Sequence, residues 1–113
     1  MDTGCLLVYV TMPDKSSAEA FGRTLVYERL AACVNILPGA TSFYWWQTKL
    51  ETAEEAVCLF KTTQEQFPAF KARARALHPH DVPCIVAWPL EQGNKEFFNW
   101  VRAETTPKPF PGS

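Results

Sequence analysis

The pattern of apolar and polar positions predicts five strands along the chain. Apolar runs rich in β-branched and aromatic residues, bounded by turn-forming residues, are typical of strands. Such runs cover residues 5–12, 33–37, 41–51, 54–62 and 84–88. The first run is apolar at nearly every position, which indicates a central strand that is covered on both faces. The third and fourth runs form a hairpin, with its turn expected near residues 51–53.

Three other segments show apolar residues at helical spacing. They are residues 17–30, a segment that ends at residue 77 and a segment that begins after Asn94, the expected cap of the third helix. Capping-box patterns stand before the first two, as Ser16-x-x-Glu19 and Thr63-x-x-Gln66. We expect the proline-rich tail, residues 107–113, to be mobile because it cannot form regular structure.

The resulting order, β-α-β-β-β-α-β-α, predicts a fold of the α+β class. Two split βαβ units with right-handed crossovers give a ferredoxin-like antiparallel α/β sandwich. The first two helices then cover one face of the sheet and leave the other face open. We expect a single domain over residues 1–106, because 113 residues with 47% hydrophobic content can build one core but are short for two.

The aromatic run over residues 41–51 is apolar on both faces. Because side chains alternate along a strand, Phe43 and Trp45 are expected on one face, and Tyr44, Trp46 and Leu50 on the other. A strand in a small antiparallel sheet normally needs only one apolar face. Helices on both sides could cover the second face, but the predicted helices are too few. We therefore expect a subunit interface, formed by Tyr44, Trp45, Trp46 and Trp100.

Charge and cysteine content narrow the classes of function. Lysine and arginine total 11 against 12 acidic residues, so no overall basic field indicates a nucleic-acid binder. The four cysteines are widely spaced, without a Cys-x-x-Cys pair, and are expected to be free thiols. Cys5, Cys33 and Cys58 are expected to be small buried fillers, whereas Cys84 is more open. Without a signal-peptide pattern or an apolar run that could span a bilayer, we expect a cytoplasmic protein.

Five separated motifs stand in order along the chain. They are Val8-Tyr-Val-Thr-x-Pro-Asp14, Glu28-Arg-Leu-Ala-Ala-Cys-Val-Asn35, Tyr44-Trp-Trp-Gln-x-Lys-Leu-Glu51, Leu59-x-Lys-Thr62 and His78-Pro-x-x-Val-Pro83. In this combination they resemble the CutA family of divalent-cation tolerance proteins. The resemblance implies a homotrimer in which edge strands join neighbouring sheets, similar in architecture to the trimeric PII signalling proteins. It also implies binding of copper or other divalent metal ions and a role in the response to metal ions.

The resemblance further implies where a metal ion binds. The site proposed for some members of the family joins a Cys, a His and a Glu. At these positions the present chain has Val10, which cannot be a ligand, His78 and Cys84, and His80 replaces a Tyr of the family pattern. We expect His78 and Cys84, with His80 as a third ligand, to bind copper or zinc, because imidazole and thiolate suit these metals. The metal is not expected to be required for folding, since such a set falls short of a closed structural zinc site.

Other interpretations of these residues stay open. A lone histidine on a turn is more often a hydrogen-bonding or exposed residue than a ligand, and His78 by itself fits the two roles about equally well. Lys61 and Asp81 fit either a structural ion pair near a subunit cleft or polar groups that orient a small ligand. The alternative to a metal-binding trimer is therefore a trimeric scaffold or PII-like signalling module that binds a small molecule or a partner protein at subunit clefts. No Gly-rich phosphate loop, nucleophile elbow or His-Glu-x-x-His motif is present, so no catalytic residues are assigned.

Overall fold

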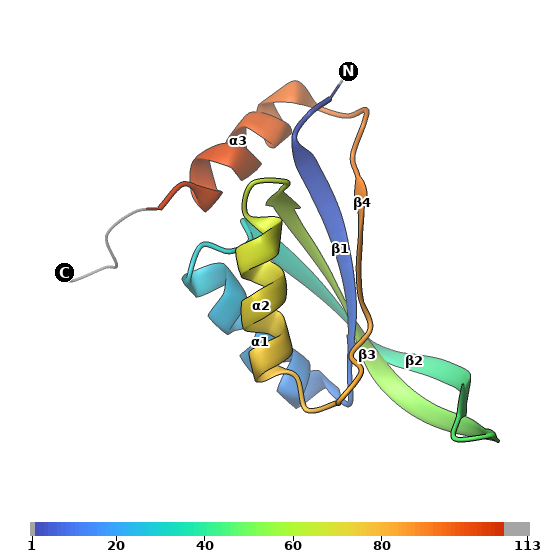
Figure 1. Cartoon of the computed structure of the whole chain (residues 1–113). Coiled ribbons are helices and arrows are strands. Elements are labelled where there is room, and N and C mark those ends of the chain that lie inside the picture. Colours follow the sequence, from blue (N-terminus) through green and yellow to red (C-terminus); the bar gives the residue numbers. More distant parts are fainter. Residues whose placement is uncertain (1, 108–113) are drawn as a thin grey trace.

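The computed structural model describes residues 2–107, which form four strands and three helices (Figure 1). In chain order the elements are β1 (Cys5–Met12), α1 (Lys15–Tyr27), β2 (Cys33–Trp46), β3 (Lys49–Thr63), α2 (Phe67–Leu77), β4 (Ile85–Pro89) and α3 (Lys95–Thr105). Residues 108–113 of the predicted mobile tail lie outside the described residues.

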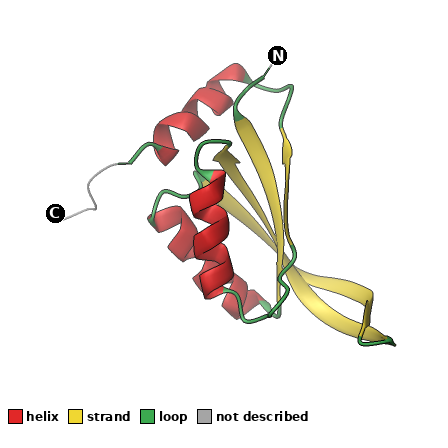
Figure 2. Cartoon of the chain, viewed as in Figure 1, coloured by secondary structure: helices red, strands yellow, loops and turns green. Residues whose placement is uncertain are grey.

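The four strands form one antiparallel sheet in the order β2-β3-β1-β4. β1 lies in the interior of the sheet, where Val8 pairs with Phe60 of β3 on one side and with Ala87 of β4 on the other. Helices α1 and α2 lie side by side across one face, as Figure 2 shows. The central position of β1 is confirmed, and the strand order is that of the expected split βαβ sandwich.

The core lies between the sheet and these two helices. Alternate residues of β1 point toward the helices, and Val8 and Val10 are completely buried there. Phe60 of β3 is at the centre, with its ring centroid 5.9 Å from that of Phe21 in α1 and 4.9 Å from that of Phe70 in α2. Edge-to-face packing of such rings adds to the free energy gained by burying them. A single chain therefore builds a complete core on this face.

The segment from residue 33 to residue 46 is one strand, whereas two strands were predicted. A β-bulge at Pro38 and Gly39 shifts the register between Leu37 and Ala40, and pairing with β3 continues on both sides of the bulge. Proline is tolerated because β2 is an edge strand, and Gly39 adopts a φ of 82° that other residues rarely take. The prediction of five strands was wrong because a bulge and a loop share the same residue types.

The hairpin turn lies at Gln47 and Thr48, not near residues 51–53. Both residues have positive φ angles, 49° and 68°, as a tight two-residue hairpin turn of the I′ type requires. Trp45 consequently pairs with Leu50, so these two side chains share a face. The predicted placement of Leu50 on the face of Tyr44 and Trp46 was therefore wrong. The far half of the hairpin projects beyond the helices (Figure 1).

The helix ends differ in part from the predicted capping boxes. Asp14, not Ser16, caps α1, and its carboxylate accepts a hydrogen bond of 2.7 Å from the Ser17 backbone N–H. The Thr63 hydroxyl accepts a bond of 3.2 Å from the Gln66 N–H, but Gln66, not Thr63, is the N-cap of α2, and no side chain caps this helix. Asn94 caps α3 as predicted, by accepting from the Glu96 N–H. The sequence pattern thus located the starts of α1 and α3 to within about two residues, whereas the cap predicted for α2 lies three residues before the observed one.

Helix α3 covers part of the second face of the sheet, at the start of β1. Phe98 and Val101 pack there against Cys5, which is completely buried. An ion pair of 2.8 Å joins Arg29, which follows α1, to Glu104 of α3. The rest of this face has no helix over it in residues 2–107, so one chain leaves much of it uncovered, as expected.

Candidate functional site

His78, the first residue after α2, is held by the backbone of two distant segments. Its side chain is buried, with only 8% of the residue's surface exposed. The ring atom Nε2 lies 2.8 Å from the Thr11 carbonyl oxygen of β1, and Nδ1 lies 3.1 Å from the His80 backbone nitrogen. The ring also meets Phe21 of α1 edge to face, at a centroid distance of 5.8 Å. These contacts tie the turn after α2 to the end of β1 and to α1.

The two partners define the tautomer of this ring. A carbonyl oxygen can only accept a hydrogen bond, so Nε2 must carry the proton and donate it to Thr11. A backbone N–H can only donate, so Nδ1 must be unprotonated and accept from His80. His78 is therefore neutral, and both of its ring nitrogens are engaged. Sequence reasoning missed Thr11 as a partner because a backbone carbonyl leaves no signal in the residue types.

His80 and Cys84 lie on the same turn and are both exposed. The His80 ring is tilted against that of His78, with centroids 5.1 Å apart. In residues 2–107 no three His, Cys, Asp or Glu side chains are grouped so that they could hold a metal ion. The structure thus does not bring His78, His80 and Cys84 together as three ligands of one site. A site completed by another subunit stays a prediction.

The thiols differ in their surroundings. All four cysteines are free, and burial raises the pKa of Cys58, in the core, to about 11. Cys5 and Cys58 are the buried fillers that were predicted, whereas Cys33 is only partly buried. Partial burial, and then the negative charge of Glu55, raise the pKa of Cys84 above its ordinary value. Cys84 remains the one exposed thiol, and it is mostly protonated at neutral pH.

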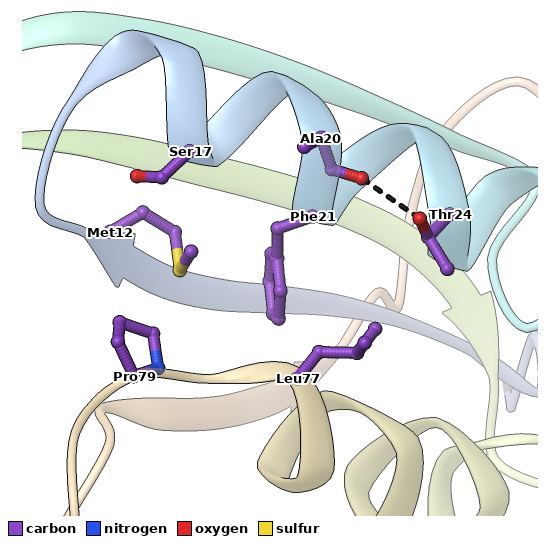
Figure 3. Close-up of a pocket in the computed structure, with 7 residues that line it drawn as sticks. All are labelled: Met12, Ser17, Ala20, Phe21, Thr24, Leu77 and Pro79. Carbon is purple, nitrogen blue, oxygen red and sulfur yellow. Dashed lines mark hydrogen bonds between the residues drawn. The ribbon is translucent and has the colours of Figure 1, made fainter.

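An apolar groove lies beside this turn, between α1 and the end of α2. It has a volume of about 320 Å³ and is lined by Met12, Ser17, Ala20, Phe21, Thr24, Leu77 and Pro79 (Figure 3). None of these side chains is charged. The Thr24 hydroxyl donates to the Ala20 carbonyl within its own helix, as the dashed line in the figure marks. The groove therefore suits an apolar group and offers no metal ligand of its own except the thioether of Met12.

Lys61 and Asp81 do not form the ion pair considered above. The Lys61 ammonium donates instead to the side-chain oxygen of Asn35, on the neighbouring strand β2. The two ion pairs found in the described part of the chain join Arg29 to Glu104 and Arg73 to Glu28. The role of Lys61 and Asp81 in orienting a small ligand stays a prediction.

The aromatic hairpin exposes large side chains on both faces. Trp45 is 73% exposed and Phe43 is 69% exposed, while Tyr44 and Trp46 on the other face are each nearly half exposed. Trp100 of α3 is also exposed, and its ring lies 5.6 Å from that of Phe97. The alternation predicted from the sequence is confirmed for these aromatics, and a single chain leaves this apolar surface in contact with water.

Comparisons with known proteins agree with this fold. The family model of the CutA1 divalent ion tolerance protein matches residues 6–104. The divalent-cation tolerance protein CutA of Thermus thermophilus is 48% identical over 99 residues, which are 88% of this chain and 96% of that protein. A solved structure of the T. thermophilus protein superposes with a TM-score of 0.86 at 46% identity, over 88% of this chain and 97% of that one.

Two further relatives correct the expected cellular location. The chloroplastic protein CutA 1 of rice, Oryza sativa, is 37% identical over 88% of this chain, which spans 56% of the rice protein. The solved structure of the periplasmic divalent cation tolerance protein CutA from Archaeoglobus fulgidus has a TM-score of 0.86 at 39% identity, over 89% of this chain and 98% of that one. A cytoplasmic location is therefore not supported for relatives of this chain, and that prediction was wrong.

No helix in residues 2–107 is long and apolar enough to cross a membrane. The shared motifs, the sheet order and the matches over nearly the whole described chain agree with one another. The chain belongs to the CutA1 divalent ion tolerance protein family.

Proposed function

We propose that this chain forms a homotrimer that binds a divalent metal ion and acts in the response or tolerance to metal ions, without catalysing a reaction. The observation that carries the proposal is the match to the divalent ion tolerance family over residues 6–104. The family is named for tolerance and not for a reaction. Copper and zinc are the metals that best suit the side chains on offer, because thiolate and imidazole favour them over magnesium or calcium.

The exposed aromatic surface supports assembly. Phe43 and Trp45 on one face of the hairpin, and Tyr44 and Trp46 on the other, give an apolar area that a monomer would leave in water. The hairpin projects from the body, where a neighbouring subunit can reach both of its faces (Figure 1). Strands β2 and β4 are the two edges of the sheet and can pair with strands of other subunits. Trp100 extends the same kind of surface onto α3.

The exposed side chains of the turn support metal binding. Cys84 and His80 are accessible, and His78 would have to give up one of its two backbone hydrogen bonds to become a ligand. A chain that supplies so few ligands leaves the remaining positions to water or to a neighbouring subunit. The core on the helix side of the sheet is complete without a metal, so the metal is dispensable for folding. Ligands at the subunit boundary would couple metal binding to assembly.

Calorimetric titration of the assembled protein with Zn²⁺ and with Cu²⁺ tests this function. The parent should take up metal saturably, and Cys84→Ser and His80→Ala should each weaken the uptake. Cys33→Ser is the matched control, because it removes a thiol from β2, away from the turn. If both turn variants bind as tightly as the parent, the metal site lies elsewhere. If the parent shows no saturable uptake, the metal-binding function is rejected.

The second candidate is a trimeric scaffold or signalling module that binds a small molecule. The groove of about 320 Å³ beside α1 supports it, since ligand pockets have volumes of about 300–1,000 Å³ and are mostly apolar. Lys61, on the second face of the sheet, could orient a polar group at a subunit cleft. A thermal shift with small apolar compounds that is abolished by Ala20→Trp, which fills the groove, would favour this candidate over the first.

A further inference from the structure

His78 occupies the position at which family resemblance predicts a metal ligand, yet its surroundings do not fit that role. A metal ion binds a ring nitrogen through its lone pair, and the lone pair of Nδ1 points at the His80 N–H, 3.1 Å away. The other nitrogen, Nε2, carries the proton that it donates to Thr11 over 2.8 Å. Coordination at either atom would leave a backbone group without its partner.

The packing around the ring opposes coordination as well. His78 is only 8% exposed, and its ring contacts two others, with centroids 5.8 Å from Phe21 and 5.1 Å from His80. A metal ion needs room for its remaining ligands or waters around the ring nitrogen. Coordination would therefore cost the ring at least one of its two backbone hydrogen bonds. The structure therefore favours the hydrogen-bonding interpretation of this histidine.

We infer that His78 is a positioning residue and not a metal ligand, and that it fixes the backbone from which His80 presents its own imidazole. The inference rests on the metal-binding function proposed above. Through Nε2, His78 is anchored to β1, and through Nδ1 it holds the His80 N–H. The exposed His80 side chain then starts from a defined backbone position on the turn that also carries Cys84. Groups that orient a metal ligand typically change metal affinity by about 10–100-fold when they are lost.

Nitrogen NMR on the assembled, ¹⁵N-histidine-labelled protein measures which histidine ring nitrogens carry a proton and which bind metal. Long-range ¹H–¹⁵N correlations distinguish a protonated ring nitrogen, an unprotonated one and one bound to metal. Without metal, His78 should show a fixed tautomer with the proton on Nε2. On addition of Zn²⁺ alone, the ring nitrogens of His80 should shift and those of His78 should keep their pattern. A metal-induced change of the unprotonated nitrogen of His78 into a coordinated one would overturn the inference.

Two substitutions of His78 distinguish a positioning role of this residue from a role as metal ligand. In His78→Asn the side-chain oxygen can stand in for Nδ1 and accept from the His80 N–H, whereas His78→Ala offers no acceptor. A positioning role predicts zinc affinity within a few-fold of the parent for His78→Asn, and a loss of about 10–100-fold for His78→Ala. Equal, large losses in both variants, with His80→Ala as tight as the parent, would identify His78 as the ligand. Circular dichroism of each variant shows that it is folded.

Measuring which ring nitrogen of His78 carries the proton distinguishes a failure of this inference from a failure of the proposed metal-binding function. If the parent takes up no zinc, the metal-binding function is rejected, but the tautomer of His78 is still measured. A fixed proton on Nε2 then supports the backbone tether, and a proton on Nδ1, or exchange between the two nitrogens, refutes it. The hydrogen bonds of His78 are thus tested by NMR, and the metal-binding function is tested by zinc uptake.

Discussion

Replacement of Trp45 by glutamate is the sharpest test of assembly. Trp45 is 73% exposed in a single chain, on the face of the hairpin that it shares with Phe43 and Leu50. Burying a large apolar side chain contributes on the order of 1.5–3 kcal/mol, so an interface that covers most of Trp45 gains about 2 kcal/mol per chain. Three chains lose about 6 kcal/mol per trimer in the variant. Since 1.4 kcal/mol corresponds to a factor of ten, the trimer dissociation constant should rise roughly 10⁴-fold.

Sedimentation velocity and light scattering over a range of protein concentrations measure this change. Trp45→Phe should stay trimeric, because it keeps most of the apolar area. Ala76→Glu is the matched control for the added charge, since Ala76 is exposed on α2, away from the hairpin. The reasoning fails if the parent is a well-folded monomer, or if Trp45→Glu dissociates at the same concentration as the parent. A folded monomer of the variant, seen by circular dichroism, would show that the core of one chain suffices.

Three further predictions concern the hairpin turn, the cap of α1 and the cysteines. Thr48→Gly should raise the free energy of unfolding in urea by about 1 kcal/mol, because a φ of 68° costs a β-branched residue about 1–2 kcal/mol. The control Ser42→Gly, within β2, should lower it, and equal effects at both positions would refute the reasoning. Hydrogen bonds from the Ser17 backbone, and then from its side chain, hold the pKa of Asp14 below its usual value. The ionised Asp14 cap therefore stabilises the folded protein fully above the unfolded pKa of about 3.9, and this stabilisation is lost as the pH falls through the lower folded pKa. The stability difference between the parent and Asp14→Asn should therefore shrink in acid, and a difference independent of pH would contradict the cap. Thiol counting in denaturant without reductant should find all four cysteines free, and reproducible pairing in fresh protein would disprove this.

Local pattern was enough to predict most of the elements of this chain. β1 is apolar at nearly every position, and that run is visible without any tertiary information. The alternation of Phe43, Tyr44, Trp45 and Trp46 across the two faces of the hairpin follows from strand geometry alone. The cap at Asn94 depends on residues that are neighbours in sequence. Such features are determined over a few residues, so the sequence specifies them directly.

The bulge and the hairpin turn were decided by pairing with another strand. Pro38 and Gly39 end a strand in most contexts, but here β3 continues past them and offers partners on both sides, so pairing resumes at Ala40. Gln47 and Thr48 are not the residues that favour a tight hairpin turn. The pairing of Trp46 with Lys49 nevertheless imposes it, because the ladder of the long hairpin outweighs the strain of two left-handed residues.

Whether His78 acts as a metal ligand or as a hydrogen-bonding residue is also decided by the tertiary structure. Motif and spacing place a histidine on the turn after α2, and they are equally compatible with a metal ligand and a hydrogen-bonding residue. The choice is made by the Thr11 carbonyl, 67 positions away in the chain, and by the His80 N–H. Every residue type except proline carries the same backbone N–H and carbonyl groups, so no sequence pattern reveals which of them a side chain will meet. Only the fold brings the end of β1 against this turn and so determines which ring nitrogen carries the proton.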